Sequence, residues 1–144
     1  MIKEENQMTR EDLRVYKYNQ EFINEQLEYI ETQKATLEKI TSTLNDMPVG
    51  SRKVEDSMAE KLASLMDKFN DILDKMNVMQ DRQQQIMDQL MQVEQPYLNI
   101  LYKVYIQGKT LVKTADEMDY SYEHMKHMHG IALLKFDELN TKSY

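Results

Sequence analysis

The chain has 144 residues, 41% of them hydrophobic and 30% charged, with a net charge of −7. It holds no Cys, no Trp, three Gly and two Pro. The absence of Cys excludes disulfides, thiolate metal sites and cysteine nucleophiles, and it is typical of a reducing compartment. Few turn residues and abundant Glu, Gln, Lys, Leu and Met favour helix, so we expect an all-α protein.

The charge is unevenly distributed along the chain. Residues 1–95 carry 12 basic and 19 acidic residues, whereas residues 96–144 carry six of each. A DNA-binding domain usually has a strongly basic face, so the neutral last third counts against DNA binding. The sequence has no apolar segment long enough to span a membrane or to form a leader, which predicts a cytoplasmic protein without membrane partners.

Two long helices are expected in residues 1–94, at about 10–46 and 53–94, with a turn at 47–52 around Pro48 and Gly50. In the first helix, residues at alternating spacings of three and four form a heptad seam that starts at Leu13 and is interrupted by polar residues such as Gln20. Such seams predict an antiparallel helical hairpin with a coiled-coil-like interior. They leave open whether the first helix packs on the second helix of the same chain or on that of a partner.

The second helix carries a wider apolar stripe than one partner helix can cover. A second column of mostly apolar residues, from Ala59 to Met87 in steps of seven, runs beside its main seam. This surplus predicts self-association into a dimer or a higher oligomer. The residues expected at that interface are Leu62, Leu65, Met66, Phe69, Ile72, Leu73 and Met76.

Residues 95–144 have the pattern of a small three-helix domain. Pro96 suits the first position of a helix that Gly108 ends. Thr110 is a candidate N-cap of a second helix and Ser121 of a third, with the small residue Ala115 allowing close approach between them. Helix, short turn and helix in this order predict a helix-turn-helix. Gly130, in the middle of the last helix, predicts close contact with a neighbouring helix.

In a helix-turn-helix the exposed start of the last helix is the element that reads base edges. Glu accepts from cytosine, Lys donates to guanine and Tyr contacts the thymine methyl group, so this segment has suitable side chains. The expected base-reading residues are Ser121, Tyr122, Glu123, His124, Lys126 and His127. Phosphate contacts, which fix register, are expected from Lys103, Lys109, Thr110 and Lys113.

All three histidines lie between His124 and His129, which raises the question of a metal site. His124 and His127 are three residues apart and share a helical face, but His129 points elsewhere. Two imidazoles without a third ligand rarely bind zinc, so no metal is expected. No phosphate-binding loop, nucleophile–base pair or paired carboxylates are present either, so we expect neither a cofactor nor an enzyme.

The segment "TLVKTADEMDYSYEHMKHMHGIALLKF" resembles the DNA-binding region 4 of bacterial sigma-70 factors. Together with "MPVGSRKVEDSMAEKLASLMD" and "PYLNILYKVYI", it resembles phage and prophage transcriptional regulators of the ArpU and RinA kind. The resemblance implies a sequence-specific DNA-binding regulator, an activator of late, lytic or packaging genes in a bacterial host cell. Its partner would be double-stranded DNA, with contact to RNA polymerase left open.

Two alternatives use the same helix-turn-helix. One is an adaptor that binds RNA polymerase, for which a neutral domain is suitable. The other is a packaging component like a small terminase subunit, which also joins such a module to a helical oligomerisation core. Salt dependence of DNA binding separates the first from a regulator, and a closed ring larger than a dimer would indicate the second.

Overall fold

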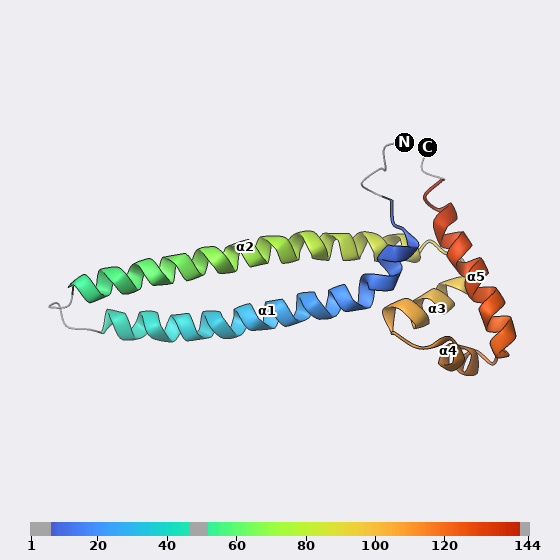
Figure 1. Cartoon of the computed structure of the whole chain (residues 1–144), viewed down its shortest axis with the longest axis horizontal. Coiled ribbons are helices and arrows are strands. Elements are labelled where there is room, and N and C mark those ends of the chain that lie inside the picture. Colours follow the sequence, from blue (N-terminus) through green and yellow to red (C-terminus); the bar gives the residue numbers. More distant parts are fainter. Residues whose placement is uncertain (1–6, 47–51, 142–144) are drawn as a thin grey trace. The chain divides into compact units, whose positions relative to one another are not determined.

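The computed structural model describes residues 7–46 and 52–141, and every regular element in that part of the chain is helical (Figure 1). This confirms the all-α prediction. The helices are α1 (Arg10–Asn45), α2 (Arg52–Leu90), α3 (Tyr97–Leu101), the π-helical turn η1 (Tyr102–Ile106), α4 (Leu111–Glu117) and α5 (Tyr122–Glu138). Within the described ranges, no helix is both long enough and apolar enough to cross a bilayer.

Two long, packed helices confirm the predicted pair, with small differences at their ends. The first helix begins at Arg10, where Thr9 and Asp12 cap each other. The backbone N–H of Thr9 donates to Oδ2 of Asp12 at 2.7 Å, and the N–H of Asp12 lies 3.4 Å from the Thr9 hydroxyl. This reciprocal arrangement satisfies backbone donors that a helix start leaves open. The second helix ends at Leu90, four residues before the predicted position 94. The predicted turn around Pro48 and Gly50 lies outside the described residues.

Residue packing divides the chain into two compact units. The hairpin unit comprises residues 22–46 and 52–79, and the terminal unit comprises residues 7–21 and 80–141. The terminal unit therefore joins the beginning of α1 and the end of α2 to the segment that the sequence predicted as a separate domain from residue 95. The helices α1 and α2 each contribute to both units.

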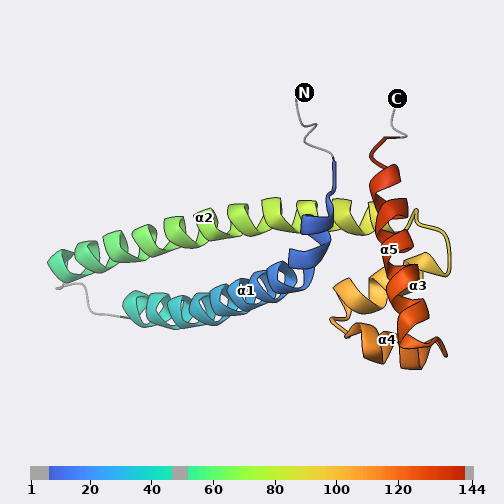
Figure 2. The same cartoon turned by 45° about the vertical axis from the view of Figure 1, so that its right-hand side comes forward.

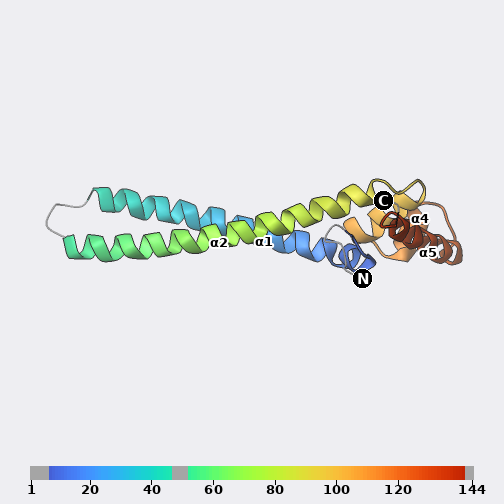
Figure 3. The same ribbon diagram turned by 90° about the horizontal axis from the view of Figure 1, so that it is seen from above.

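In the hairpin unit, α1 and α2 lie side by side and antiparallel (Figures 1 and 3). Ile30 and Leu37 on α1 are buried with Phe69 on α2, and the rings of Tyr29 and Phe69 meet edge to face with centroids 6.5 Å apart. The spacing of seven between Ile30 and Leu37 brings both side chains onto one face of the helix. Part of the seam predicted from the sequence, at Ile30 and Leu37, therefore lies in the interior of this hairpin unit.

The larger core belongs to the terminal unit, where the α3–α5 region is best seen in Figure 2. It combines residues far apart in the sequence, each buried beneath the surface: Met8, Leu13, Tyr16, Ile86, Leu90, Val93, Leu101, Ala132, Leu133 and Phe136. Each large apolar side chain that is fully buried contributes about 1.5–3 kcal/mol. This shared core is why residues 7–21 and 80–94 form one unit with α3, η1 and α5.

A polar layer crosses the terminal unit at Gln83, whose side chain is only 2% exposed. Its Nε2 donates to the backbone carbonyl of Tyr16 at 2.9 Å and lies 3.3 Å from Oε1 of Gln20. Gln20 is one of the residues that interrupt the predicted apolar seam. Because a buried amide must keep its hydrogen bonds, this pair fixes the register of α1 against α2.

Two local predictions on glycine and proline need correction. Gly130 is exposed, and a Cβ added there would meet no atom within 4 Å, so the predicted close contact with a neighbouring helix is wrong. The glycine simply lies on the solvent side of α5. Pro96 lies one position earlier than predicted, as the N-cap residue of α3, and the Gln95–Pro96 peptide bond is cis.

Candidate functional site

The helices α4 and α5 are joined by a four-residue connection, and side-chain caps begin both. The Thr110 hydroxyl accepts from the backbone N–H of Lys113 at 3.1 Å, and the Ser121 hydroxyl accepts from that of His124, also at 3.1 Å. Asp119, inside the connection, has a φ of 59°. Both predicted caps are confirmed, and they fix where each helix starts.

Small and apolar residues hold α4 against α5 and α3. Ala115 on α4 is buried with Ile100 on α3 and Met125 on α5. Thr114 beside it is also buried, and its hydroxyl donates to the carbonyl of Thr110 at 2.8 Å. Because the side chain of Ala115 is only a methyl group, α4 can pack closely on α5, as predicted from the sequence.

The start of α5 presents polar side chains to solvent. All six predicted base-reading residues are exposed: Ser121, Tyr122, Glu123, His124, Lys126 and His127. Lys126 lies 3.3 Å from Glu123 and 5.2 Å from the centre of the Tyr122 ring. An exposed ion pair of this spacing contributes only a few tenths of a kcal/mol, so a ligand displaces it at little cost.

The predicted phosphate contacts divide into two groups. Lys103 and Lys109 both donate from Nζ to Oε1 of Glu117, at 2.9 Å and 2.7 Å. The hydrogen bonds from Lys109 and Lys103 lower the pKa of Glu117 from 4.5 to about 2, so this carboxylate stays ionised. These two lysines therefore already share an anion within the fold. Thr110 and Lys113 are exposed at the start of α4.

His129 pairs with a residue that sequence reasoning did not single out. Its Nε2 lies 2.8 Å from the hydroxyl of Tyr105, and the two rings stack with centroids 5.8 Å apart. Burial, with a smaller contribution from the charges of Arg10 and Arg14, lowers the pKa of His129. His129 is thus half-buried, whereas His124 and His127 are exposed. The described residues include no group of three or more potential metal ligands.

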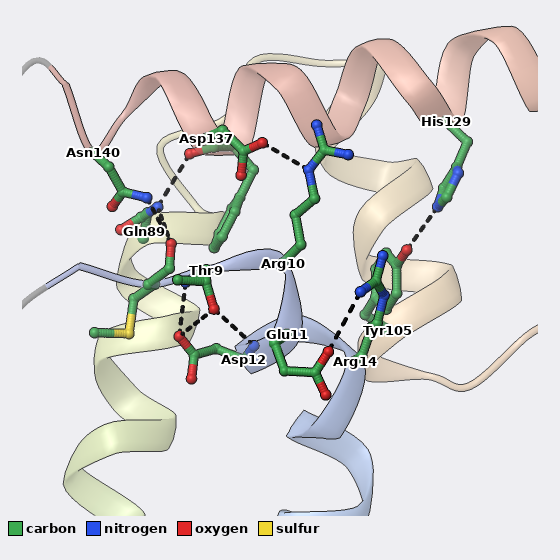
Figure 4. A network of polar contacts seen from close by, with 12 residues as sticks. Thr9, Arg10, Glu11, Asp12, Arg14, Gln89, Tyr105, His129, Asp137 and Asn140 are labelled. Carbon is green, nitrogen blue, oxygen red and sulfur yellow. Dashed lines mark hydrogen bonds and ion pairs between the residues drawn. The ribbon is translucent and has the colours of Figure 1, made fainter. Parts of the chain in front are cut away.

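Figure 4 shows the polar contacts that join the first residues of α1 to the end of α5. Arg10 Nε lies 2.7 Å from Asp137 Oδ2, and Asn140 donates to the carbonyl of Met8 at 2.7 Å. Gln89, on α2, donates to the carbonyl of Phe136 at 3.1 Å. Such contacts between distant segments have no signal in a single sequence, because no local pattern marks them.

The residues predicted at an oligomer interface lie at different depths in the hairpin unit. Phe69 and Met76 are buried within the chain's own fold, and Leu65 and Met66 are 40% and 39% exposed. The remaining three, Leu62, Ile72 and Leu73, are half-buried. Only the exposed members are free to contact a second copy without rearrangement.

No family model, no curated protein and no solved structure matches this chain. The functional interpretation therefore depends on the residues themselves.

Proposed function

We propose that this chain is a sequence-specific DNA-binding transcriptional regulator of the phage type, in which α4 and α5 form the helix-turn-helix. The observation that carries the proposal is the exposed, capped start of α5. Its polar side chains are exposed to solvent, and helix starts of this kind enter the major groove of DNA.

The local construction of α4 and α5 supports this proposal. Capping by Thr110 and Ser121 gives both helices defined starts, and Ala115 permits the close crossing that a helix-turn-helix requires. Residues Tyr122, Glu123, Lys126 and His127 then share one sector of the helix surface. The sequence resemblance to sigma-70 region 4 and to regulators of the ArpU and RinA kind covers the same segment.

A polymerase-binding adaptor is the second candidate, and one observation favours it. Lys103 and Lys109 both lie on Glu117, and residues 96–144 are neutral overall. Fewer free cations mean fewer phosphate contacts, and therefore weaker DNA binding with a shallow dependence on salt.

Selection of duplexes from a randomised DNA library by the purified full-length chain provides the test. Fluorescence anisotropy then measures the affinity for the selected duplex and for a scrambled one across a salt series. A regulator binds the selected duplex at least about 1,000-fold more tightly. The Lys126→Ala/His127→Ala variant should lose most of that preference.

The matched control is the Lys61→Ala/Lys68→Ala variant, which changes two exposed residues of the hairpin unit and should keep the preference. If no sequence emerges from the selection and binding to all duplexes is weak, the regulator proposal is wrong. Binding of purified bacterial RNA polymerase under those conditions would support the adaptor instead.

A further inference from the structure

A hollow with two cationic side chains lies in the terminal unit, where the first turns of α1 pass the connection between η1 and α4. A hollow of about 320 Å³ opens there. The residues that line it and carry the argument are Arg14, Lys17, Tyr18, Glu21, Tyr105 and Gly108. None of these was predicted from the sequence to contact a ligand.

Among the described residues, both cations of this hollow form weak ion pairs with carboxylates on their own helix. Arg14 Nη1 lies 3.4 Å from Glu11 and Lys17 Nζ lies 3.8 Å from Glu21, and about half of each side chain is exposed. Exposed pairs of this kind contribute little and exchange readily for another anion. This distinguishes Arg14 and Lys17 from Lys103 and Lys109, which share the carboxylate of Glu117 at shorter distances.

Gly108 makes room for one of these cations. A Cβ added at this position would lie 2.5 Å from Nζ of Lys17 and 2.7 Å from its Cδ. The residue also has a φ of +71°, which side chains rarely adopt. The backbone thus leaves space for the Lys17 side chain to lie directly on the η1–α4 connection.

The wall of the hollow is itself unusual. Tyr105 belongs to the π-helical turn η1, in which the N–H of Gln107 bonds to the carbonyl of Tyr102. Such turns are rare and are frequently found at functional sites. The exposed ring of Tyr18 adds an amphipathic surface at the rim of the hollow.

We infer that Arg14 and Lys17 bind a backbone phosphate of the same DNA duplex that α5 reads, an inference that rests on the proposed function. Gly108 precedes the α4 cap Thr110 by only two residues, so the hollow adjoins the helix-turn-helix. A guanidinium and an ammonium on one phosphate group are the usual cationic contacts to a DNA backbone. A free phosphate ester has the same chemistry and must be distinguished by experiment.

The test measures the salt dependence of binding to the selected duplex by anisotropy. The Arg14→Gln/Lys17→Gln variant should reduce the slope of log affinity against log salt by about 1, because the loss of one phosphate contact removes about 0.9. Affinity for scrambled DNA should fall by the same factor, since phosphate contacts carry no sequence information. The Arg14→Lys/Lys17→Arg variant keeps both charges and should keep the slope.

The control variant is Lys61→Gln/Lys68→Gln, which removes two charges from the hairpin unit and should leave the slope within about 0.3 of the wild type. A wild-type chain that does not bind DNA contradicts the proposed function. Normal wild-type binding with an unchanged slope in Arg14→Gln/Lys17→Gln overturns only this inference.

Titration with inorganic phosphate at constant ionic strength separates the two sources of phosphate, with the amide resonance of Gly108 followed by NMR. The inference expects saturation only at concentrations far above those of the duplex. Tight binding of inorganic phosphate, together with an unchanged DNA slope, would assign the hollow to a small phosphate compound and overturn the inference.

Discussion

Tyr105 and His129 form a stacked pair in which the tyrosine hydroxyl lies 2.8 Å from Nε2 of the imidazole. Burial, and then Arg10 and Arg14, lower the pKa of His129 from its ordinary value of 6.5. The unfolded chain therefore binds a proton at a pH where the folded chain does not. The contribution of His129 to stability is complete above about pH 6.5 and is lost as the pH falls below it towards the lowered pKa.

Replacing His129 by Gln should remove this part of the pH dependence. Urea unfolding followed by circular dichroism, from about pH 5 to about pH 7.5, should show a smaller rise in the free energy of unfolding for His129→Gln than for the wild type. His127→Gln removes an exposed histidine and serves as the matched control. Equal slopes for His129→Gln and the wild type would contradict this account of the pair.

Gly130→Ala should stabilise the protein. The position is exposed within α5, and an added Cβ meets no atom within 4 Å. Ala is favoured over Gly in a helix interior by about 1 kcal/mol, partly because it restricts the unfolded chain. Thermal unfolding should show a melting temperature higher by several degrees, and a lower one would contradict the exposed position of Gly130.

Gly108→Ala should destabilise the protein, in contrast to Gly130→Ala. Its φ of +71° strains any side chain, and the Cβ would lie 2.5 Å from Nζ of Lys17. We expect a loss of about 1–2 kcal/mol in the free energy of unfolding, measured by urea titration. A Gly108→Ala/Lys17→Ala double variant separates the two causes, because it removes the crowding but keeps the backbone strain. If the double variant recovers wild-type stability, the strain at this φ is negligible.

Glu117→Gln should strengthen DNA binding if the proposed function is correct. The carboxylate now lies on Nζ of both Lys103 and Lys109, and its removal makes both available to phosphate. The slope of log affinity against log salt should steepen by about 1–2. Anisotropy measures this slope, with Glu60→Gln in the hairpin unit as control. An unchanged slope would show that these lysines do not contact the duplex.

Phe69→Ala and Leu65→Ala separate the hairpin interior from its surface. Phe69 is 4% exposed, so its replacement by Ala should lower the free energy of unfolding by about 3–5 kcal/mol. Leu65 is 40% exposed, so its replacement should lower it by less than about 1 kcal/mol. Urea unfolding measures both changes. Sedimentation velocity of Leu65→Ala in parallel tests the predicted self-association, which should weaken if the exposed Leu65 contacts a second copy.

Heptad spacing was sufficient to predict the two long helices and the face that each buries, because positions such as Ile30 and Leu37 share a face through helix periodicity. It did not decide whether the partner helix belongs to the same chain. The caps at Thr110 and Ser121 were also predictable, because each acts within one turn of its own helix. Local rules therefore located the helices and the exposed side chains of α5.

Predictions that needed distant parts of the chain were less successful. A glycine inside a helix either makes room for a close neighbour or lies where the helix simply tolerates it. For Gly130 the sequence offered no means to choose between these two explanations. The contact of Tyr105 with His129 joins residues 24 apart, and nothing in either segment marks it. The cationic hollow at Arg14 and Lys17 was missed for the same reason, since those residues belong to α1 and the hollow also requires η1 and Gly108.

The terminal unit is assembled from residues 7–21 and 80–141, which are separated in the sequence by the hairpin unit. Arg10 pairs with Asp137 across 127 residues, and Met8 accepts a hydrogen bond from Asn140 across 132. The hairpin unit ends at residue 79, so we expect its core to form while later residues are still being synthesised. The first turns of α1 must wait, with Leu13 and Tyr16 exposed, until Ala132 and Phe136 have left the ribosome. We therefore expect the core of the terminal unit to form after that of the hairpin unit.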